Sequence, residues 1–155
     1  MTTPEEPTHR ETMKLAPYGR RVGGYLLDGV IIGGGYLVAI AIFATSRVPL
    51  LGLLLGVALA IVYPWLMIAF SQGQTLGMKA VKVKCVDAKT GKVPSAGKAL
   101  GRTFGAILCN IIFFVGWLDL LWPAWDQKRQ TLHDKMAGTL VVDVGIAPNT
   151  TVTFG

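Results

Sequence analysis

The sequence is poor in charge and in cysteine. Charged residues make up 15% of its 155 residues and hydrophobic residues 52%, a balance that indicates membrane segments rather than an ordinary soluble domain. The two cysteines, Cys85 and Cys109, have no metal-binding spacing, and we expect both to be free thiols. A catalytic nucleophile with its base, a zinc-binding set and a phosphate-binding loop are all missing from the sequence. We therefore expect neither an enzyme nor a bound metal or cofactor.

Two long runs of the sequence are almost free of charge. Between residues 22 and 45 the single charged residue is Asp28, and residues 48–78 contain none. A helix of about 20 residues crosses the ~30 Å hydrocarbon core of a bilayer, so we predict transmembrane helices at residues 22–45 and 48–71. The lipid bilayer is therefore the first expected partner.

A third apolar region, residues 102–125, is interrupted by Asp119. The sequence FFVGW within it, followed by Pro123, indicates a break near Gly116. Irregular backbone at membrane depth is tolerated only where protein or a water-filled cavity covers it. We predict a broken or re-entrant helical segment here, with a single crossing as the alternative.

The cations are distributed unevenly around these runs. Four precede the first run and Arg47 alone lies between the two, whereas seven follow the second run: Lys79, Lys82, Lys84, Lys89, Lys92, Lys98 and Arg102. Cytoplasmic loops of membrane proteins are enriched in lysine and arginine, so we expect the N-terminus and the long loop to be cytoplasmic. This pattern explains the net charge of +6 without nucleic acid as a partner.

Two short segments have the pattern of β-strands. The sequence KAVKVKCVD alternates apolar and charged residues, and TLVVDV, residues 139–144, is rich in valine. Lone strands are unstable, so we predict that the two pair, which requires a cytoplasmic C-terminal tail. The predicted fold is an all-α membrane protein with a small cytoplasmic β module: a disordered tail at 1–16, a membrane domain at 17–144 and a C-terminal tail at 145–155.

Asp28 is the unusual residue of the first span. Helical periodicity puts Arg21 and Asp28 on nearly one face of the helix, and a carboxylate within the membrane is costly unless it has a partner or water. The candidate partners are Arg21 and Arg102, with His133 or Lys135 if the tail folds back. Asp28 is then either a proton or cation site or one half of a salt bridge that fixes helix packing.

Glycines recur four residues apart in the apolar regions. The pairs are Gly29 with Gly33, Gly52 with Gly56, and Gly101 with Gly105. Such spacing lets helix backbones approach closely in lipid, and we expect these pairs to serve helix packing.

Three blocks of the sequence resemble one family. They are RRVGGYLLD, GQTLGMKAVKVKCVDAKTGKVPSAGKALGRTFG and KRQTLHDKMAGTLVV, and together they resemble the RDD family of small bacterial and archaeal membrane proteins, named for one arginine and two aspartates. The resemblance assigns the arginine to Arg21, with Arg20 as the alternative, and the first aspartate to Asp28. The second aspartate falls on Asp134, with Asp119 as the competing choice.

The resemblance also implies a location and a function. It implies a bacterial plasma membrane and a part in transport, since some members act as sodium/proton antiporters. Our leading hypothesis is ion or small-solute transport, with monovalent cations or protons as partners and Arg102, Asp119 and His133 in support. Three short hydrophobic segments seldom enclose a transport pathway alone. We therefore expect a homo-oligomer or a larger membrane complex. The alternative is a non-transporting accessory subunit or assembly factor.

Overall fold

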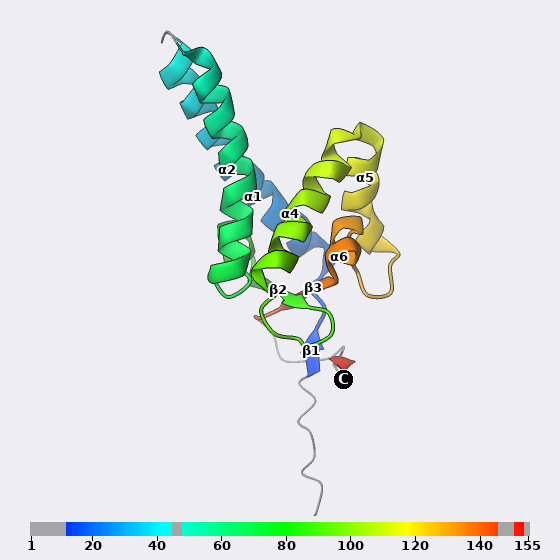
Figure 1. The fold of residues 1–155 in the computed structure, drawn as a ribbon. Coiled ribbons are helices and arrows are strands. Elements are labelled where there is room, and N and C mark those ends of the chain that lie inside the picture. The colour runs from blue at the N-terminus through cyan, green and yellow to red at the C-terminus, as the bar shows by residue number, and fades with distance from the viewer. Residues whose placement is uncertain (1–11, 45–47, 146–150, 154–155) are drawn as a thin grey trace, which may run out of the picture.

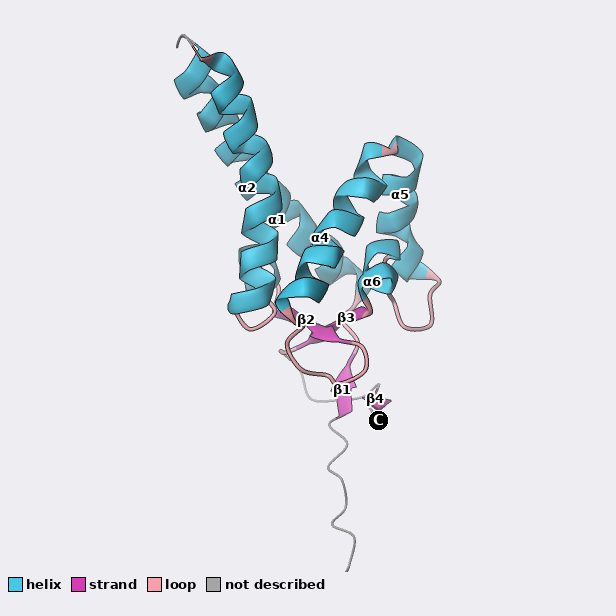
Figure 2. Ribbon diagram, viewed as in Figure 1, coloured by secondary structure: helices cyan, strands magenta, loops and turns pink. Residues whose placement is uncertain are grey.

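Two long apolar helices form the first half of the chain in the computed structural model, which describes residues 12–44, 48–145 and 151–153. Helix α1 (Tyr18–Ala44) and helix α2 (Pro49–Phe70) run side by side and rise from a small sheet (Figures 1 and 2). Both are long and apolar enough to cross a membrane, and few of their residues are buried within the molecule, as expected for helices that face lipid. They correspond to the two predicted spans.

Glycine permits the close contact between α1 and α2. A Cβ atom at Gly52 would lie 2.9 Å from the Ala39 carbonyl oxygen, and a Cβ atom at Gly56 would overlap the Tyr36 ring. The expected packing role of this glycine pair is confirmed. A Cβ atom at Gly29 or Gly33 would meet nothing within 4 Å, so that pair makes no such contact with the described residues.

The third apolar region consists of two helices rather than one. Helix α4 (Ala96–Ile111) ends where Ile112 leaves helical geometry, with φ −93° and ψ 98°, and α5 (Phe113–Leu121) packs beside α4 before the 3₁₀ turn η1 (Trp122–Ala124). The segment is thus broken, but the break precedes the predicted position near Gly116. Gly116 lies inside α5, where a Cβ atom would be 3.3 Å from the Asn110 side chain, so this glycine serves packing and not the turn.

Strands β2 (Val83–Asp87) and β3 (Thr139–Asp143) pair in antiparallel register, with Cys85 opposite Val141. This confirms the predicted pairing. Both strands are buried almost throughout and form the centre of the apolar core. Cys85 and Cys109 are free thiols, as expected.

The end of the predicted N-terminal tail belongs to the fold. Strand β1 (Thr12–Lys14) pairs with β4 (Thr151–Thr153), and the Ala16 amide donates to the Val141 carbonyl at 3.0 Å. Leu15 and Ala16 are buried. Residues 12–16 therefore do not form a disordered tail, because these two apolar side chains pack into the core, while residues 1–11 lie outside the described part of the chain.

The tripeptide Gln-Thr-Leu occurs at residues 74–76 and again at 130–132, and a short helix begins at each copy. Thr75 is the N-cap of α3 (Leu76–Ala80), and Thr131 is the N-cap of α6 (Leu132–Ala137). The glutamine before each threonine donates to the first residue of the strand that follows: Gln74 to the Val83 carbonyl and Gln130 to the Thr139 carbonyl, both at 2.8 Å.

The two halves of the chain repeat the same order of elements. Each half consists of a helical hairpin, a short helix opened by Gln-Thr-Leu and one strand. The residue before each strand has positive φ, 57° at Lys82 and 62° at Gly138. Cys85 and Val141 are equivalent in this repeat and pair with each other. The two hairpins diverge above the sheet (Figure 1).

Candidate functional site

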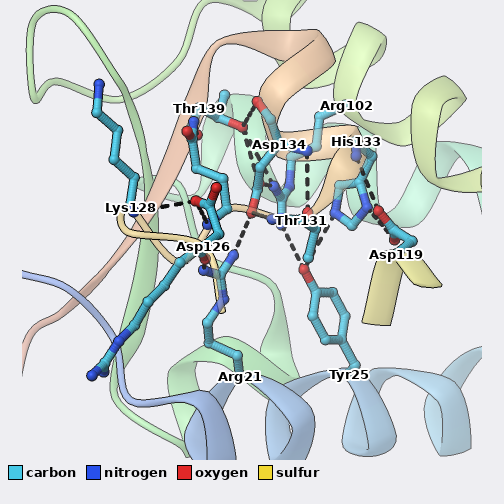
Figure 3. Close-up of polar contacts among 12 residues, drawn as sticks. Arg21, Tyr25, Arg102, Asp119, Asp126, Lys128, Thr131, His133, Asp134 and Thr139 are labelled. Carbon is cyan, nitrogen blue, oxygen red and sulfur yellow. Dashed lines mark hydrogen bonds and ion pairs between the residues drawn. The ribbon is translucent and has the colours of Figure 1, made fainter. Parts of the chain in front are cut away.

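Asp134 joins the two halves of the molecule. Its backbone lies in the capping box of α6, where its carboxylate accepts from the Thr131 amide at 3.2 Å. The same carboxylate forms ion pairs with Arg21 of α1 and Arg102 of α4 (Figure 3). All three charged groups are buried, so two guanidinium groups share one carboxylate out of contact with solvent.

Asp28 has neutral partners, so the predicted pairing with Arg21 is wrong. Its carboxylate accepts hydrogen bonds from the Tyr63 hydroxyl at 2.8 Å, the Thr75 hydroxyl at 2.5 Å and the Gly77 amide at 2.9 Å. No ion pair among the described residues includes Asp28, and Arg102, His133 and Lys135 bind other carboxylates. Two turns of helix separate Arg21 from Asp28, which puts Arg21 beside α6 and Asp28 beside α3.

The approach of Asp28 to α3 depends on a glycine. A Cβ atom at Gly77 would lie 2.8 Å from the Asp28 Cγ and still closer to the Gly24 carbonyl oxygen. Only a residue without a side chain lets this amide reach the carboxylate. The hydrogen bond also satisfies one of the N–H groups that the first turn of a helix leaves unpaired.

Asp119 binds the second short helix as Asp28 binds the first. Its carboxylate accepts from the His133 amide at 3.0 Å and contacts His133 Nδ1 at 2.6 Å. Gly77 and His133 occupy the same position after Gln-Thr-Leu, so Asp28 and Asp119 have equivalent roles in the two halves. They differ in origin, since Asp28 comes from the first helix of its hairpin and Asp119 from the second.

The surroundings of His133 favour the neutral form of its ring. Burial, reinforced by the charge of Arg102, lowers its pKa to about 4, although Asp119 acts in the opposite direction. Its one ring proton therefore lies on Nδ1, where Asp119 accepts it, and Nε2 accepts from the Tyr25 hydroxyl at 3.3 Å. Arg102 in turn donates to the Tyr25 oxygen at 3.1 Å. A continuous chain of hydrogen bonds thus runs from Asp119 to the Arg102–Asp134–Arg21 cluster (Figure 3).

A cleft of about 1080 Å³ lies between the two hairpins. Its walls are mainly apolar and come from all four hairpin helices. Its polar end, which we call the floor, includes both equivalent carboxylates and lies above the sheet: Tyr25, Asp28, Thr75, Arg102, Thr103, Asp119 and His133 line it. The carboxylates of Asp28 and Asp119 thus reach the same cavity from opposite halves of the chain.

The other predicted site residues lie apart from the cleft. Arg20 forms an ion pair with Asp143 at 2.9 Å, and Lys135 forms one with Asp126 at 2.5 Å. The described residues contain no group of three or more side chains suited to holding a metal ion. Sequence reasoning missed Tyr63, whose hydroxyl binds Asp28, and the equivalence of the two halves. The repeated Gln-Thr-Leu was the available signal for that equivalence.

Two helices of membrane length, joined through a buried arginine–aspartate cluster to a shorter helical hairpin, define a small helical membrane protein. The sequence matches the model of the RDD family over residues 15–138, so the chain belongs to the RDD family. Arg21, Asp28 and both candidates for the second family aspartate, Asp134 and Asp119, lie in or next to the site described above.

Several known proteins are similar to parts of the chain. The proline-rich antigen homolog of Mycobacterium tuberculosis (strain ATCC 25618 / H37Rv) is 38% identical over 72 residues, which cover 46% of this chain and 29% of that protein. The uncharacterized protein YxaI of Bacillus subtilis (strain 168) is 33% identical over 90 residues, 58% of this chain and 56% of that protein. The chain therefore matches less than two thirds of either relative. No solved structure matches it.

Proposed function

We propose that this RDD family membrane protein transports a monovalent cation or a small solute in exchange for protons, and that the cleft between its hairpins is the binding site. One observation carries the proposal: two carboxylates, Asp28 and Asp119, reach one cleft from opposite halves and are each more than nine-tenths buried. Ionisable groups within a membrane are costly, and they mark ion and substrate pathways. A carboxylate at this position can release a proton when a cation enters the cleft.

The proposed arrangement in the plasma membrane follows the charges. Helices α1 and α2 cross the bilayer, and the shorter α4–α5 hairpin enters it from the cytoplasmic side and returns. The sheet and both described ends of the chain are then cytoplasmic, together with the seven cations from Lys79 to Arg102. A membrane-impermeant thiol reagent tests this orientation: a cysteine at position 128 should be protected in intact cells, and one at position 48 should be modified.

Asp28 and the Arg21–Asp134–Arg102 cluster have different roles in this proposal. Asp28 faces the cleft and takes part in transport, whereas Arg21 and Asp134 hold the two halves together. Asp28→Asn keeps an oxygen acceptor for Tyr63 or Gly77 but removes the negative charge. We therefore expect this variant to insert normally and to lose function.

The test is proton flux in proteoliposomes that contain the purified protein and a pH-sensitive dye. A pulse of sodium or potassium should release protons with the wild-type protein and not with Asp28→Asn. Asp126→Asn is the matched control, because Asp126 does not line the cleft and its replacement should leave the flux unchanged. Equal flux with Asp28→Asn would remove Asp28 from the mechanism.

A second candidate function is that of an accessory subunit or assembly factor. Two observations favour it: Asp28 makes three hydrogen bonds within the chain, which suits a packing device, and glycines at positions 29, 33 and 34 have open space before them. The native mass in mild detergent separates the candidates. A homo-oligomer supports transport, whereas a stoichiometric complex with an unrelated membrane protein supports the accessory function.

A further inference from the structure

The buried carboxylates around the floor of the cleft are not all paired with a cationic side chain. Asp134 is shared by Arg21 and Arg102, and Asp119 contacts His133. Asp28 accepts hydrogen bonds from neutral groups alone among the described residues. The floor therefore holds one buried carboxylate without a cationic partner.

The other carboxylates in the described part of the chain are paired elsewhere. Their partners are Lys98 for Asp87, Lys135 for Asp126 and Arg20 for Asp143. None of these six residues lines the cleft. Attraction between charges is strong where the dielectric constant is low, and an uncompensated charge within a membrane is costly. The cleft therefore favours an occupant that brings one positive charge and disfavours an anion.

The walls of the cleft suit an organic cation better than an alkali ion. An alkali ion that sheds its water needs a ring of oxygen ligands, but the oxygens of Asp28 already accept three hydrogen bonds and those of Asp119 accept two from His133. The cleft is as large as pockets that bury drug-sized ligands, which measure about 300–1,000 Å³. Aromatic rings of Tyr25, Tyr36 and Trp117 line it, and such rings attract organic cations through their faces.

We infer that the cleft binds an organic monocation with apolar substituents, held by the negative floor formed by Asp28 and Asp119 and by the aromatic and apolar walls. The inference rests on the proposed function, because it names the class of solute that the cleft would carry. It does not depend on flux, since binding is measured at equilibrium.

The test uses two ions of the same shape and opposite charge. Tetraphenylphosphonium and tetraphenylborate are titrated by calorimetry into the full-length protein in a mild detergent, and titrations into protein-free micelles are subtracted. We expect one tetraphenylphosphonium to bind per cleft and tetraphenylborate not to bind. Equal binding of both ions would make the cleft a neutral apolar surface for lipid or for a second copy of the chain, and would overturn the inference.

Charge variants test the floor. Asp28→Asn removes the carboxylate that has no cationic partner, and Asp119→Asn removes the carboxylate that reaches the cleft from the other half of the chain. Each should weaken tetraphenylphosphonium binding at least tenfold. Asp126→Asn, which removes a carboxylate outside the cleft, should leave the affinity unchanged. Unchanged affinity in both cleft variants would overturn the inference.

A steric pair of variants tests the location without altering charge. A Cβ atom at either Gly33 or Gly34 meets nothing within 4 Å, but Gly33 lines the cleft and Gly34 does not. Both glycines therefore have open space where a side chain would begin. Gly33→Phe should abolish binding and Gly34→Phe should preserve it, whereas the same affinity in both variants would contradict the assigned site.

The outcomes separate this inference from the proposed function. If wild-type protein binds no tetraphenylphosphonium but still releases protons on a sodium pulse, the inference is overturned and transport of inorganic cations stands. If it binds tetraphenylphosphonium with the expected variant effects but shows no flux with any cation, the inference stands and transport is overturned.

Discussion

Replacing Asp134 by asparagine should destabilise the protein more than any other single isosteric change at the site. The carboxylate is fully buried and is the shared partner of Arg21 and Arg102. Asparagine retains an oxygen that can accept from the Thr131 amide, so the cap of α6 is largely kept. The substitution removes the negative charge, so the buried guanidinium groups of Arg21 and Arg102 lose their shared anionic partner. Breaking a buried ion pair by removing one partner costs about 3–5 kcal/mol.

The assay is unfolding in mixed micelles as the fraction of sodium dodecyl sulfate increases, followed by circular dichroism. Lys135→Gln is the control, because it changes the next residue of the same helix and breaks an ion pair with Asp126 in which the lysine is 42% exposed. That pair should contribute about 0.2–1 kcal/mol. A second replacement, Arg102→Leu, should recover part of the loss in Asp134→Asn because it removes one stranded charge. An Asp134→Asn effect no larger than that of Lys135→Gln would refute the reasoning.

Three further predictions concern packing, pH and hydrogen bonding. Gly56→Ala should destabilise the hairpin of α1 and α2 by about 1–3 kcal/mol, because the new Cβ atom would overlap the Tyr36 ring. In the same unfolding assay, Gly29→Ala should be neutral or slightly stabilising, because its Cβ atom meets nothing within 4 Å and alanine favours the helix. Because the pKa of His133 is about 4 in the folded protein and 6.5 when unfolded, the unfolded chain binds more protons between these values. Stability should therefore be constant above about pH 6.5 and fall as the pH decreases toward 4, and His133→Asn should remove that slope from unfolding curves measured across this range. Tyr63→Phe removes one hydrogen bond to Asp28 and should cost about 1.5–3 kcal/mol in the same assay.

Much of the fold could be predicted from local patterns. The absence of charge over residues 48–78 indicates a membrane-length helix because a bilayer requires that length and polarity. The alternation in KAVKVKCVD and the valine-rich run at residues 139–144 predicted the pairing of the two strands, because each strand needed a partner. The position of the break between α4 and α5 was harder to predict, since Ile112 has no strong turn preference, whereas Gly116 has one and is used for packing instead.

The candidate site could be predicted only in part. Arg21 and Asp28 share a helix face, but proximity along one helix did not identify their partners, which arrive from α3 and α6. A carboxylate within a membrane needs a partner, and Asp28 has three. They are two hydroxyl groups and one backbone amide rather than the expected cation. Asp119 and Asp134 competed for one role in the sequence. In the structure, Asp119 lines the cleft and Asp134 binds the two arginines.

The most direct test of the account is cation-driven proton flux through proteoliposomes containing wild-type protein, Gly33→Phe or Gly34→Phe. The glycines are neighbours with equally open surroundings, and Gly33 alone lines the cleft. If the cleft is the transport site, the wild type and Gly34→Phe release protons at similar rates and Gly33→Phe does not. Equal flux in all three, or none in the wild type with any monovalent cation, would contradict the account.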